Sequence, residues 1–335
     1  MQCKYLIYRA VEHDIHFNLA TEAFLMEKLQ SGTNALFLWR NAPTVVIGRY
    51  QNPFIECNLG NMDRDGVKLA RRFSGGGAVY HDLGNLCFTF IRPKDQFSKE
   101  RNFSIVAKAL KSLGLHTEVS GRNDILANGA KISGNAFQIT TDRVCHHGTL
   151  LFDCALDVLP FYLTPDIIKL ESHGVKSVAS RVKNIRDLND SISIQDIENA
   201  LIREFKEDCH ADCQTMDLEK ENLIRDPYIQ EVYSRLSSKQ WNLGMTPRFK
   251  DLLKGRNSFG SFSFQLDIDR AVIKKASVYT DSLQTTEVET LMSRLVGLSY
   301  DSNALRLESE KEKDLFLKEA LMLLSDLIAA GQNSK

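Results

Sequence analysis

The chain has 335 residues, of which 43% are hydrophobic and 25% are charged, and its formal net charge is −1. This composition is ordinary for a soluble globular protein of about two domains, and no stretch approaches the roughly 18 apolar residues of a membrane span. A net charge near zero gives no general attraction to nucleic acid or anionic lipid, so any anion site must be local. The first eight residues indicate a strand and not a signal peptide or basic presequence, so we expect a cytoplasmic protein. No feature of the sequence demands an oligomer, so we expect a monomer.

The first half of the chain alternates helix and strand patterns. The spacing of apolar residues predicts, in chain order, a helix over 16–29, strands over 35–39 and 44–48, a helix ending near Gly66, and strands over 67–73 and 86–91. Asn18 is the expected N-cap of the first helix, and turn residues between the first two strands favour a hairpin. The glycine-rich stretch after residue 73 is therefore expected to connect two strands, unlike the strand-to-helix turn of a P-loop.

A second hairpin is predicted by Asn128-Gly129, a pair typical of a type I′ turn between two strands. This turn would bring Asp124 and Lys131 close together across the two strands. The same region is bounded by a predicted helix over 102–113, which Gly114 closes, and by a strand over 144–152.

The second half is dominated by helical patterns until a connection near Gly244 and Pro247. Helices are expected to begin after Ser193 and at Pro227. Beyond the connection, the patterns predict strands over 262–268 and 273–279 and helices over 287–296 and 311–330. We therefore expect a first domain over 1–245 and a small α+β domain over 246–335.

Seven cysteines are spread over the chain without the spacing of a disulfide framework, so reduced thiols are the simplest interpretation. Two short segments, 209–213 and 145–147, combine cysteine with histidine. Neither contains the C-x-x-C pairs of a structural zinc site, and the sequence therefore does not favour metal ligation by cysteine.

The densest signal for chemistry is the stretch 71–82, in which Gly75, Gly76 and Gly77 follow the pair Arg71-Arg72. Three consecutive glycines are costly in a helix or strand, but they let a ligand approach the main chain, and their N–H groups can bind an anion. Guanidinium groups beside them indicate a phosphate or a carboxylate. The alternative is a glycine-rich hairpin that carries surface arginines.

This stretch resembles the signature of lipoate–protein ligases, within the biotin/lipoate ligase fold group. The resemblance extends in order over most of the first 180 residues, through the segments 17–22, 36–41, 44–49, 51–58, 121–124, 131–134 and 146–150. It implies an α+β fold, with a mixed sheet flanked by helices and a small C-terminal α+β domain. One departure is Phe73, where close relatives have a small polar residue.

The resemblance also implies a reaction in two halves. Lipoate, or alternatively octanoate, would attack the α-phosphate of ATP with Mg²⁺ as cofactor, which gives lipoyl-AMP and pyrophosphate. The acyl group would then pass to a lysine on the lipoyl domains of 2-oxoacid dehydrogenase complexes (the E2 subunits) or on the glycine cleavage H protein. The segment 177–181 is expected to face that acceptor.

Site residues follow from the same resemblance. Lys131 would contact both the lipoyl carboxylate and the α-phosphate, where its charge reduces the repulsion between two anions. Asp124 would hold Mg²⁺ or orient Lys131. The residues expected to contact ATP are Arg72, Gly75, Gly76, Gly77, Ala78, Val79, Tyr80, Asn123 and Lys131. Those expected to contact the acyl substrate are Trp39, Leu19, Arg72, His81, His147 and Lys131, with Val79 as further apolar wall.

Simpler interpretations remain for several of these residues. Lys131 alone would be a solvated charge at the edge of a sheet, and Leu19 and Trp39 would be plain core. The main functional alternative is an octanoyl or lipoyl transferase that works through a cysteine thioester, for which Cys145 and Cys154 are candidates. A biotin ligase and a non-catalytic lipoate binder fit the motifs less well.

Overall fold

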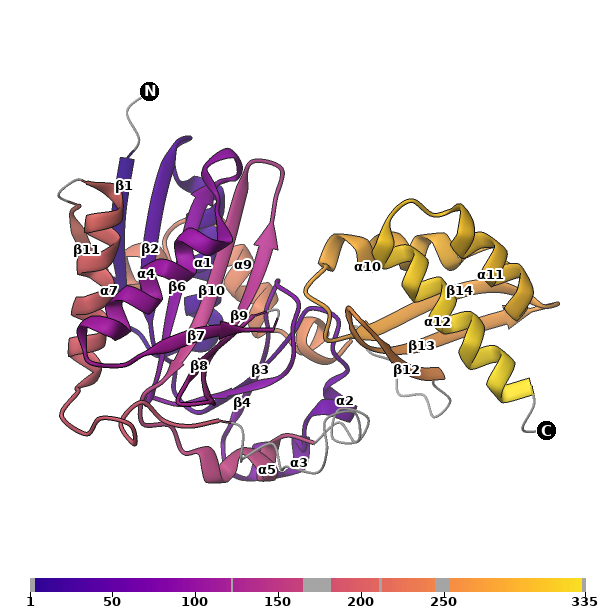
Figure 1. The fold of residues 1–335 in the computed structure, drawn as a ribbon, viewed down its shortest axis with the longest axis horizontal. Helices are drawn as coiled ribbons and strands as arrows, with labels where there is room; N and C mark the ends of the chain where they lie inside the picture. The colour runs from indigo at the N-terminus through magenta and orange to yellow at the C-terminus, as the bar shows by residue number, and fades with distance from the viewer. Residues whose placement is uncertain (1–3, 122, 165–181, 211–212, 245–252, 333–335) are drawn as a thin grey trace.

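The computed structural model describes residues 4–121, 123–164, 182–210, 213–244 and 253–332. Two parts lie side by side in Figure 1, a large one built on a mixed sheet and a small C-terminal one. The architecture is α+β, as the sequence predicts. None of the helices in these ranges is long and apolar enough to cross a membrane.

An eight-stranded mixed sheet forms the centre of the large part, in the order β11-β1-β2-β6-β10-β9-β8-β7. Its strands are β1 (Lys4–Ala10), β2 (Thr33–Trp39), β6 (Asn85–Pro93), β7 (Thr117–Ser120), β8 (Asp124–Ala127), β9 (Ala130–Ile139), β10 (Arg143–Leu151) and β11 (Thr215–Leu218). Strands β11, β1 and β2 run parallel, and the other neighbours pair antiparallel. Both faces of β2 and β6 are buried, which fits their mostly apolar sequences.

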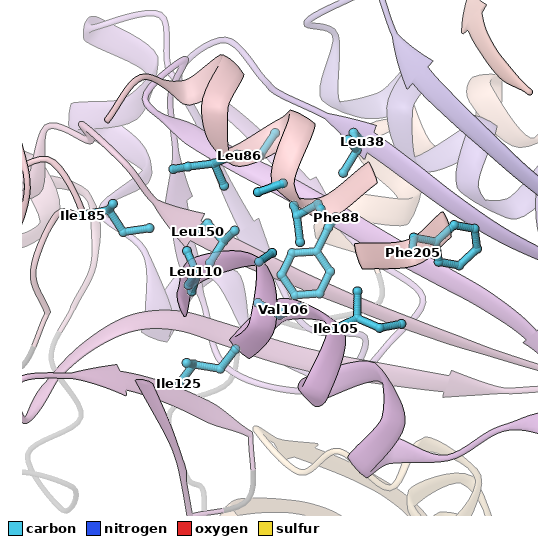
Figure 2. Close-up of a cluster of buried hydrophobic side chains, with 14 of the residues drawn as sticks. Leu38, Leu86, Phe88, Ile105, Val106, Leu110, Ile125, Leu150, Ile185 and Phe205 are labelled. Carbon is cyan, nitrogen blue, oxygen red and sulfur yellow. The ribbon is translucent and has the colours of Figure 1, made fainter. Parts of the chain in front are cut away.

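Helices cover both faces of this sheet. On one face, α4 (Lys99–Ser112) and α7 (Ile194–Cys209) bury an apolar cluster around Phe88, part of which Figure 2 shows. On the other face, α1 (Ile15–Lys28) and α9 (Pro227–Ser237) pack against a second cluster. Ser193 caps α7 as expected, and its hydroxyl and the Asp196 carboxylate form a capping box.

The first helix begins earlier than predicted. Asp14 is the N-cap of α1, because its side chain accepts a hydrogen bond from the His16 backbone. Asn18 lies within the helix and is fully buried, where its amide donates to the carbonyl of Arg40 and to the side chain of Asn41. The prediction of Asn18 as N-cap was wrong because Asn is favoured both at caps and where it can bind neighbouring backbone.

The predicted hairpin of the strands near residues 35–48 is also wrong. β2 belongs to the large sheet, whereas β3 (Thr44–Ile47) lies between β4 (Lys68–Arg71) and β5 (Val79–His81) in a separate three-stranded sheet. Between β3 and β4 the chain forms the short helices α2 (Pro53–Glu56) and α3 (Leu59–Arg64). The glycine-rich stretch connects β4 to β5, which confirms its prediction as a link between strands.

The small C-terminal part consists of a three-stranded antiparallel sheet, β12 (Leu253–Asn257), β13 (Gly260–Asp269) and β14 (Val272–Thr280), covered by helices. The helices are α10 (Thr285–Leu295), α11 (Ser302–Lys311) and α12 (Leu315–Gln332). The sequence predicted α10 and α12 but not α11, whose mean composition is too polar to give a clear apolar period. The connection at residues 245–252 lies outside the described residues.

Short elements complete the large part. They are η1 (Lys94–Gln96), η2 (Leu156–Val158), α5 (Leu159–Tyr162), α8 (Lys220–Leu223) and a π-turn, η4 (Gln240–Gly244).

Candidate active site

The glycine loop, residues 74–78 between β4 and β5, requires bare backbone at defined positions. A Cβ atom on Gly48 would lie 2.1 Å from the carbonyl oxygen of Gly76, and one on Gly75 would lie 2.1 Å from the carbonyl oxygen of Ser282. Gly76 has a positive φ of 96°, which L-residues rarely adopt. Gly77 has no atom within 4 Å of its Cβ position, so the loop faces open space there.

Arg72 stabilises this loop from beneath. Its buried guanidinium donates to the carbonyls of Gly75 (2.7 Å) and Gly77 (2.8 Å) and to the hydroxyl of Ser74 (3.1 Å). Burial lowers the pKa of Arg72 to about 10, which still leaves it charged at neutral pH. The loop therefore lies over a fixed positive charge, although the Arg72 donors are engaged by the loop and by the Val46 carbonyl (3.2 Å).

Arg71 has a different role, since it joins segments that are distant in sequence. Its buried side chain donates to the carbonyls of Gln51 (2.7 Å), Arg49 (3.0 Å) and Asn242 (2.9 Å). These carbonyls belong to the turn after β3 and to η4. Arg71 thus fixes the base of β4 rather than facing a ligand.

The type I′ hairpin of β8 and β9 is present as predicted, with positive φ at both Asn128 (51°) and Gly129 (75°). Lys131 Nζ lies 2.8 Å from Asp124 Oδ1, and the two side chains are 32% and 35% exposed. The two groups form a close ion pair. The lysine is therefore partly neutralised but still accessible.

A β-bulge decides which way Lys131 faces. The register shifts in β9 so that Ile125 pairs with Ser133 and Leu126 pairs with Lys131, which leaves Ile132 unpaired. A single extra residue reverses the alternation of faces, so Lys131 shares a face with Gly134 and Ala136. Two distances agree with this: a Cβ atom added to Gly134 would lie 3.2 Å from Lys131 Nζ, and one added to Gly76 would lie 3.9 Å from Ala136 Cβ. Lys131 therefore lies on the face of β9 that is next to the glycine loop at Ala136.

Below the loop, three side chains form a hydrogen-bonded chain that the sequence did not predict. His147 Nε2 lies 2.7 Å from Ser74 Oγ, and its Nδ1 lies 2.9 Å from a carboxylate oxygen of Glu22. All three residues are buried. Burial alone would raise the pKa of Glu22, but the neighbouring His147 ring and the Thr89 hydroxyl hold it below its ordinary value. Glu22 is therefore an ionised carboxylate inside the protein.

The expected acyl wall residues Leu19, Trp39 and Val79 come together in the apolar cluster beside this chain. Trp39 Nε1 donates to the Thr89 hydroxyl (3.0 Å), which donates to Glu22 (2.7 Å). His81 packs edge-on against Trp39 at 6.4 Å. Burial, together with the charges of Arg72 and His147, lowers the pKa of His81 to about 3, so the ring is neutral.

The remaining residues expected at the site pack against neighbouring elements. Ala78 and Tyr80 pack in the apolar cluster beneath β3, and Tyr80 stacks on Tyr162 with ring centroids 5.6 Å apart. Asn123 is engaged in a mutual amide contact with Asn135, whose amide donates to the Asn123 carbonyl at 3.0 Å. Asn123 thus fixes the start of β8, directly before Asp124.

The protein-family model "Lipoyl protein ligase A/B catalytic domain" matches residues 14–206, and "Bacterial lipoate protein ligase C-terminus" matches residues 246–321. The chain is 40% identical over 295 residues to lipoate-protein ligase A of Psychrobacter cryohalolentis, an alignment that covers 87% of each chain. The chain belongs to the lipoate–protein ligase family.

Solved structures agree with this assignment. The ligase resembles P. falciparum LipL1 in complex with lipoate at a TM-score of 0.84 and 31% identity, over 96% of this chain and 99% of that one. It also resembles a bipartite ligase studied with its E2 lipoyl domain from Thermoplasma acidophilum (TM-score 0.65, 28% identity, 74% and 100% of the two chains). A lipoate-protein ligase A bound with ATP matches at a TM-score of 0.62 and 29% identity, over 73% and 99%.

The cysteines required by the transferase alternative are poorly suited to attack. Cys145 and Cys154 are both buried, and burial raises the pKa of each thiol well above its ordinary value. A protonated, enclosed thiol is a weak nucleophile. The ligase is thus not built around either cysteine as an acyl carrier.

The small C-terminal part of the ligase reaches the glycine loop. The backbone N–H of Gly76 donates to the Ser282 carbonyl (3.0 Å), and that of Thr280 donates to the Tyr50 carbonyl (3.1 Å). Tyr50 also packs in the apolar core of the small part, where its hydroxyl donates to Glu289. The connection between β14 and α10 therefore closes over one side of the loop.

Glu22, Ser74, Thr89 and Ser282 are the site residues that sequence reasoning missed. Glu22 did carry a signal, because it lies three residues after Leu19 on the apolar face of α1, where a carboxylate needs a partner. Ser282 carried none, since its contact involves the backbone carbonyl. The segment 177–181, expected to face the acceptor protein, lies outside the described residues.

Proposed function

We propose that this ligase joins lipoate to protein lysines by way of lipoyl-AMP, with ATP as the source of the adenylate. The observation that carries the proposal is the partly exposed Lys131, turned by the β-bulge toward the side of the glycine loop. Adenylation brings a carboxylate and a triphosphate together. A positive charge between two anions reduces their repulsion and stabilises the charge that develops at the phosphorus.

In the first half-reaction, the glycine loop would receive the phosphates. The open side of Gly77 leaves room for an anion, and the buried Arg72 charge lies beneath. Arg72 fixes the shape of the loop through the carbonyls of Gly75 and Gly77, while the Gly76 N–H is engaged by the Ser282 carbonyl. Ala78, Val79, Tyr80 and Asn123 are proposed to contact ATP beside this loop.

Magnesium fits at Asp124. The Asp124 carboxylate is about one-third exposed beside Lys131, and a carboxylate oxygen is a ligand that Mg²⁺ prefers. A bound Mg²⁺ would neutralise phosphate charge beside Lys131. Asp124 also orients Lys131 through the 2.8 Å ion pair.

The acyl chain would enter the apolar cluster of Leu19, Trp39 and Val79. His81 supports this assignment, because its Nε2 atom is buried and without a hydrogen-bond partner among the described residues, while its Nδ1 contacts Asn41. The His81 and His147 rings would form polar points on an otherwise apolar wall. Burial of the mixed anhydride there would protect it from water.

In the second half-reaction, a lysine amine on a lipoyl domain would attack the acyl carbon, and AMP would leave. The resemblance to a ligase studied with its E2 lipoyl domain supports this class of partner. E2 subunits of 2-oxoacid dehydrogenases and the glycine cleavage H protein are the proposed acceptors. The ligase supplies no nucleophile in this step, so its contribution is to position the incoming amine.

Mass spectrometry of the acceptor tests the complete reaction. Wild-type ligase, ATP, Mg²⁺ and lipoate are incubated with a purified lipoyl domain, and we expect one lipoyl group on one lysine. Omission of ATP should abolish the product. If the product forms equally well without ATP from an acyl thioester, the protein is a transferase and the proposal is wrong.

A further inference from the structure

A second cluster of chemically active side chains lies behind the acyl wall. Glu22, Cys145 and His147 each offer one donor atom, and these atoms all lie within 4.8 Å of one another. Cys145 and His147 alternate with His146 along β10, so both face α1, whereas His146 stacks on Phe137 on the opposite face. Glu22 completes the cluster from α1.

From this arrangement we propose that Glu22, Cys145 and His147 form a binding site for a thiophilic divalent cation of the zinc class. A carboxylate, a thiolate and an imidazole are ligands that Zn²⁺ accepts together. Mg²⁺ requires an almost complete set of oxygen ligands, and the cluster supplies a single carboxylate. The site is therefore chemically distinct from the one proposed at Asp124.

The charges of the donors match such a cation. A carboxylate on Glu22 and a thiolate on Cys145 would supply two negative charges against the two positive charges of the metal. The thiol proton would be released to solvent when the metal binds.

The neighbours of the cluster already orient its donors. Thr89 donates to Glu22 at 2.7 Å, and Ser74 lies 2.7 Å from the His147 Nε2 atom. For His147 to bind a metal through Nδ1, its proton must reside on Nε2, where Ser74 Oγ can accept it. Such a partner on the second ring nitrogen is typical of metal-bound histidines.

One consequence rests on the proposed function. Thr89 connects the cluster to Trp39, and the proposed function places His147 at the acyl wall. A cation here would take His147 away from its contact with the substrate, so it would inhibit lipoate activation. Binding of the cation itself requires neither ATP nor lipoate. A protein that binds the metal but does not activate lipoate would contradict only the proposed function, and one that activates lipoate but binds no metal would contradict only the metal site.

Cobalt titration of the wild-type protein is the direct test, because Co²⁺ bound to a thiolate gives a charge-transfer absorbance. We expect one Co²⁺ per chain, with that absorbance, and its displacement by Zn²⁺. Cobalt bound without the thiolate absorbance, or no stoichiometric binding at all, would overturn the site. The measurement needs no variant, so it does not depend on the folding of a mutant.

Two variants sharpen the result. Cys145→Val should weaken Co²⁺ binding by at least about 100-fold and remove the thiolate absorbance. Loss of a residue that only hydrogen-bonds to a metal ligand already costs about 10–100-fold in metal affinity, and Cys145 would itself be a ligand. Glu22→Gln should weaken binding but keep the absorbance. The matched control is Cys57→Val, since Cys57 is also buried but belongs to the cluster beneath β3. Equal affinity in Cys145→Val and Cys57→Val would show that the cation binds elsewhere.

Discussion

Two pairs of charged groups at the site differ in their exposure to water. Lys131 and Asp124 form an ion pair that is about one-third exposed, on a hairpin at the edge of the site. Glu22 and His147 form a pair that is buried beneath the glycine loop. An exposed pair contributes little to stability, whereas breaking a buried pair leaves an uncompensated charge. In the proposed mechanism, this difference separates a cation that reaches the substrate from charges that hold the site in shape.

Lys131→Ala is expected to give the largest effect. Removal of the ammonium should reduce lipoate activation by at least about 10³-fold, about 4 kcal/mol of transition-state stabilisation. The free energy of unfolding should change little because the pair is exposed. Activity and urea unfolding are measured together, with Lys254→Ala as a control at an exposed lysine of the small part. A Lys131→Ala variant that is clearly less stable in urea but keeps wild-type activity would contradict both expectations.

Glu22→Gln tests the buried pair. The loss of charge leaves His147 with a weaker partner, and we expect the free energy of unfolding to fall by about 2–3 kcal/mol at neutral pH. The pKa of Glu22 is lower in the folded state than its ordinary value, which applies in the unfolded chain. The stabilisation from this carboxylate is therefore fully present above the unfolded-state pKa and is lost as the pH falls through the folded-state pKa. The difference between wild type and variant should therefore shrink in acid. Glu118→Gln, at an exposed position, should show no such difference.

His81 should make the folded state sensitive to acid. Its pKa is lowered from 6.5 to about 3 by burial, so between these values the unfolded chain binds a proton that the folded chain does not. Stability should therefore decrease as the pH falls below 6.5, by at most about 1.4 kcal/mol per pH unit from this group. His81→Asn should flatten this part of the curve. An unchanged slope would mean that the ring is protonated in the fold.

The smallest effect is expected from the cysteines. Cys145→Val and Cys154→Ala should each keep ligase activity within about threefold, because a thiol with a raised pKa takes no part in the reaction. Loss of all activity in either variant, with the fold intact by circular dichroism, would favour a thioester mechanism.

Local chemistry explains what the sequence could predict. The turn at Asn128-Gly129 depends on two adjacent residues, and it placed Asp124 beside Lys131 correctly. The link of β4 to β5 through the glycines was also correct. The comparisons confirm the family, but the roles of individual site residues stay predictions.

Long-range pairing explains what the sequence could not predict. β2 and β3 are adjacent in the chain but belong to different sheets, because β2 pairs with β1 and β6. The buried contact of Glu22 with His147 joins a helix to a strand more than a hundred residues away. No local spacing indicates such a contact, although a carboxylate on the apolar face of α1 was a sign that a partner exists.

The most direct test of the central claim is exchange of labelled pyrophosphate into ATP in the absence of any acceptor protein. This exchange reports the first half-reaction alone. The account predicts that label enters ATP only when lipoate and Mg²⁺ are present, and that Lys131→Ala abolishes the exchange. Exchange at the wild-type rate in Lys131→Ala, or no lipoate-dependent exchange in the wild type, would contradict it.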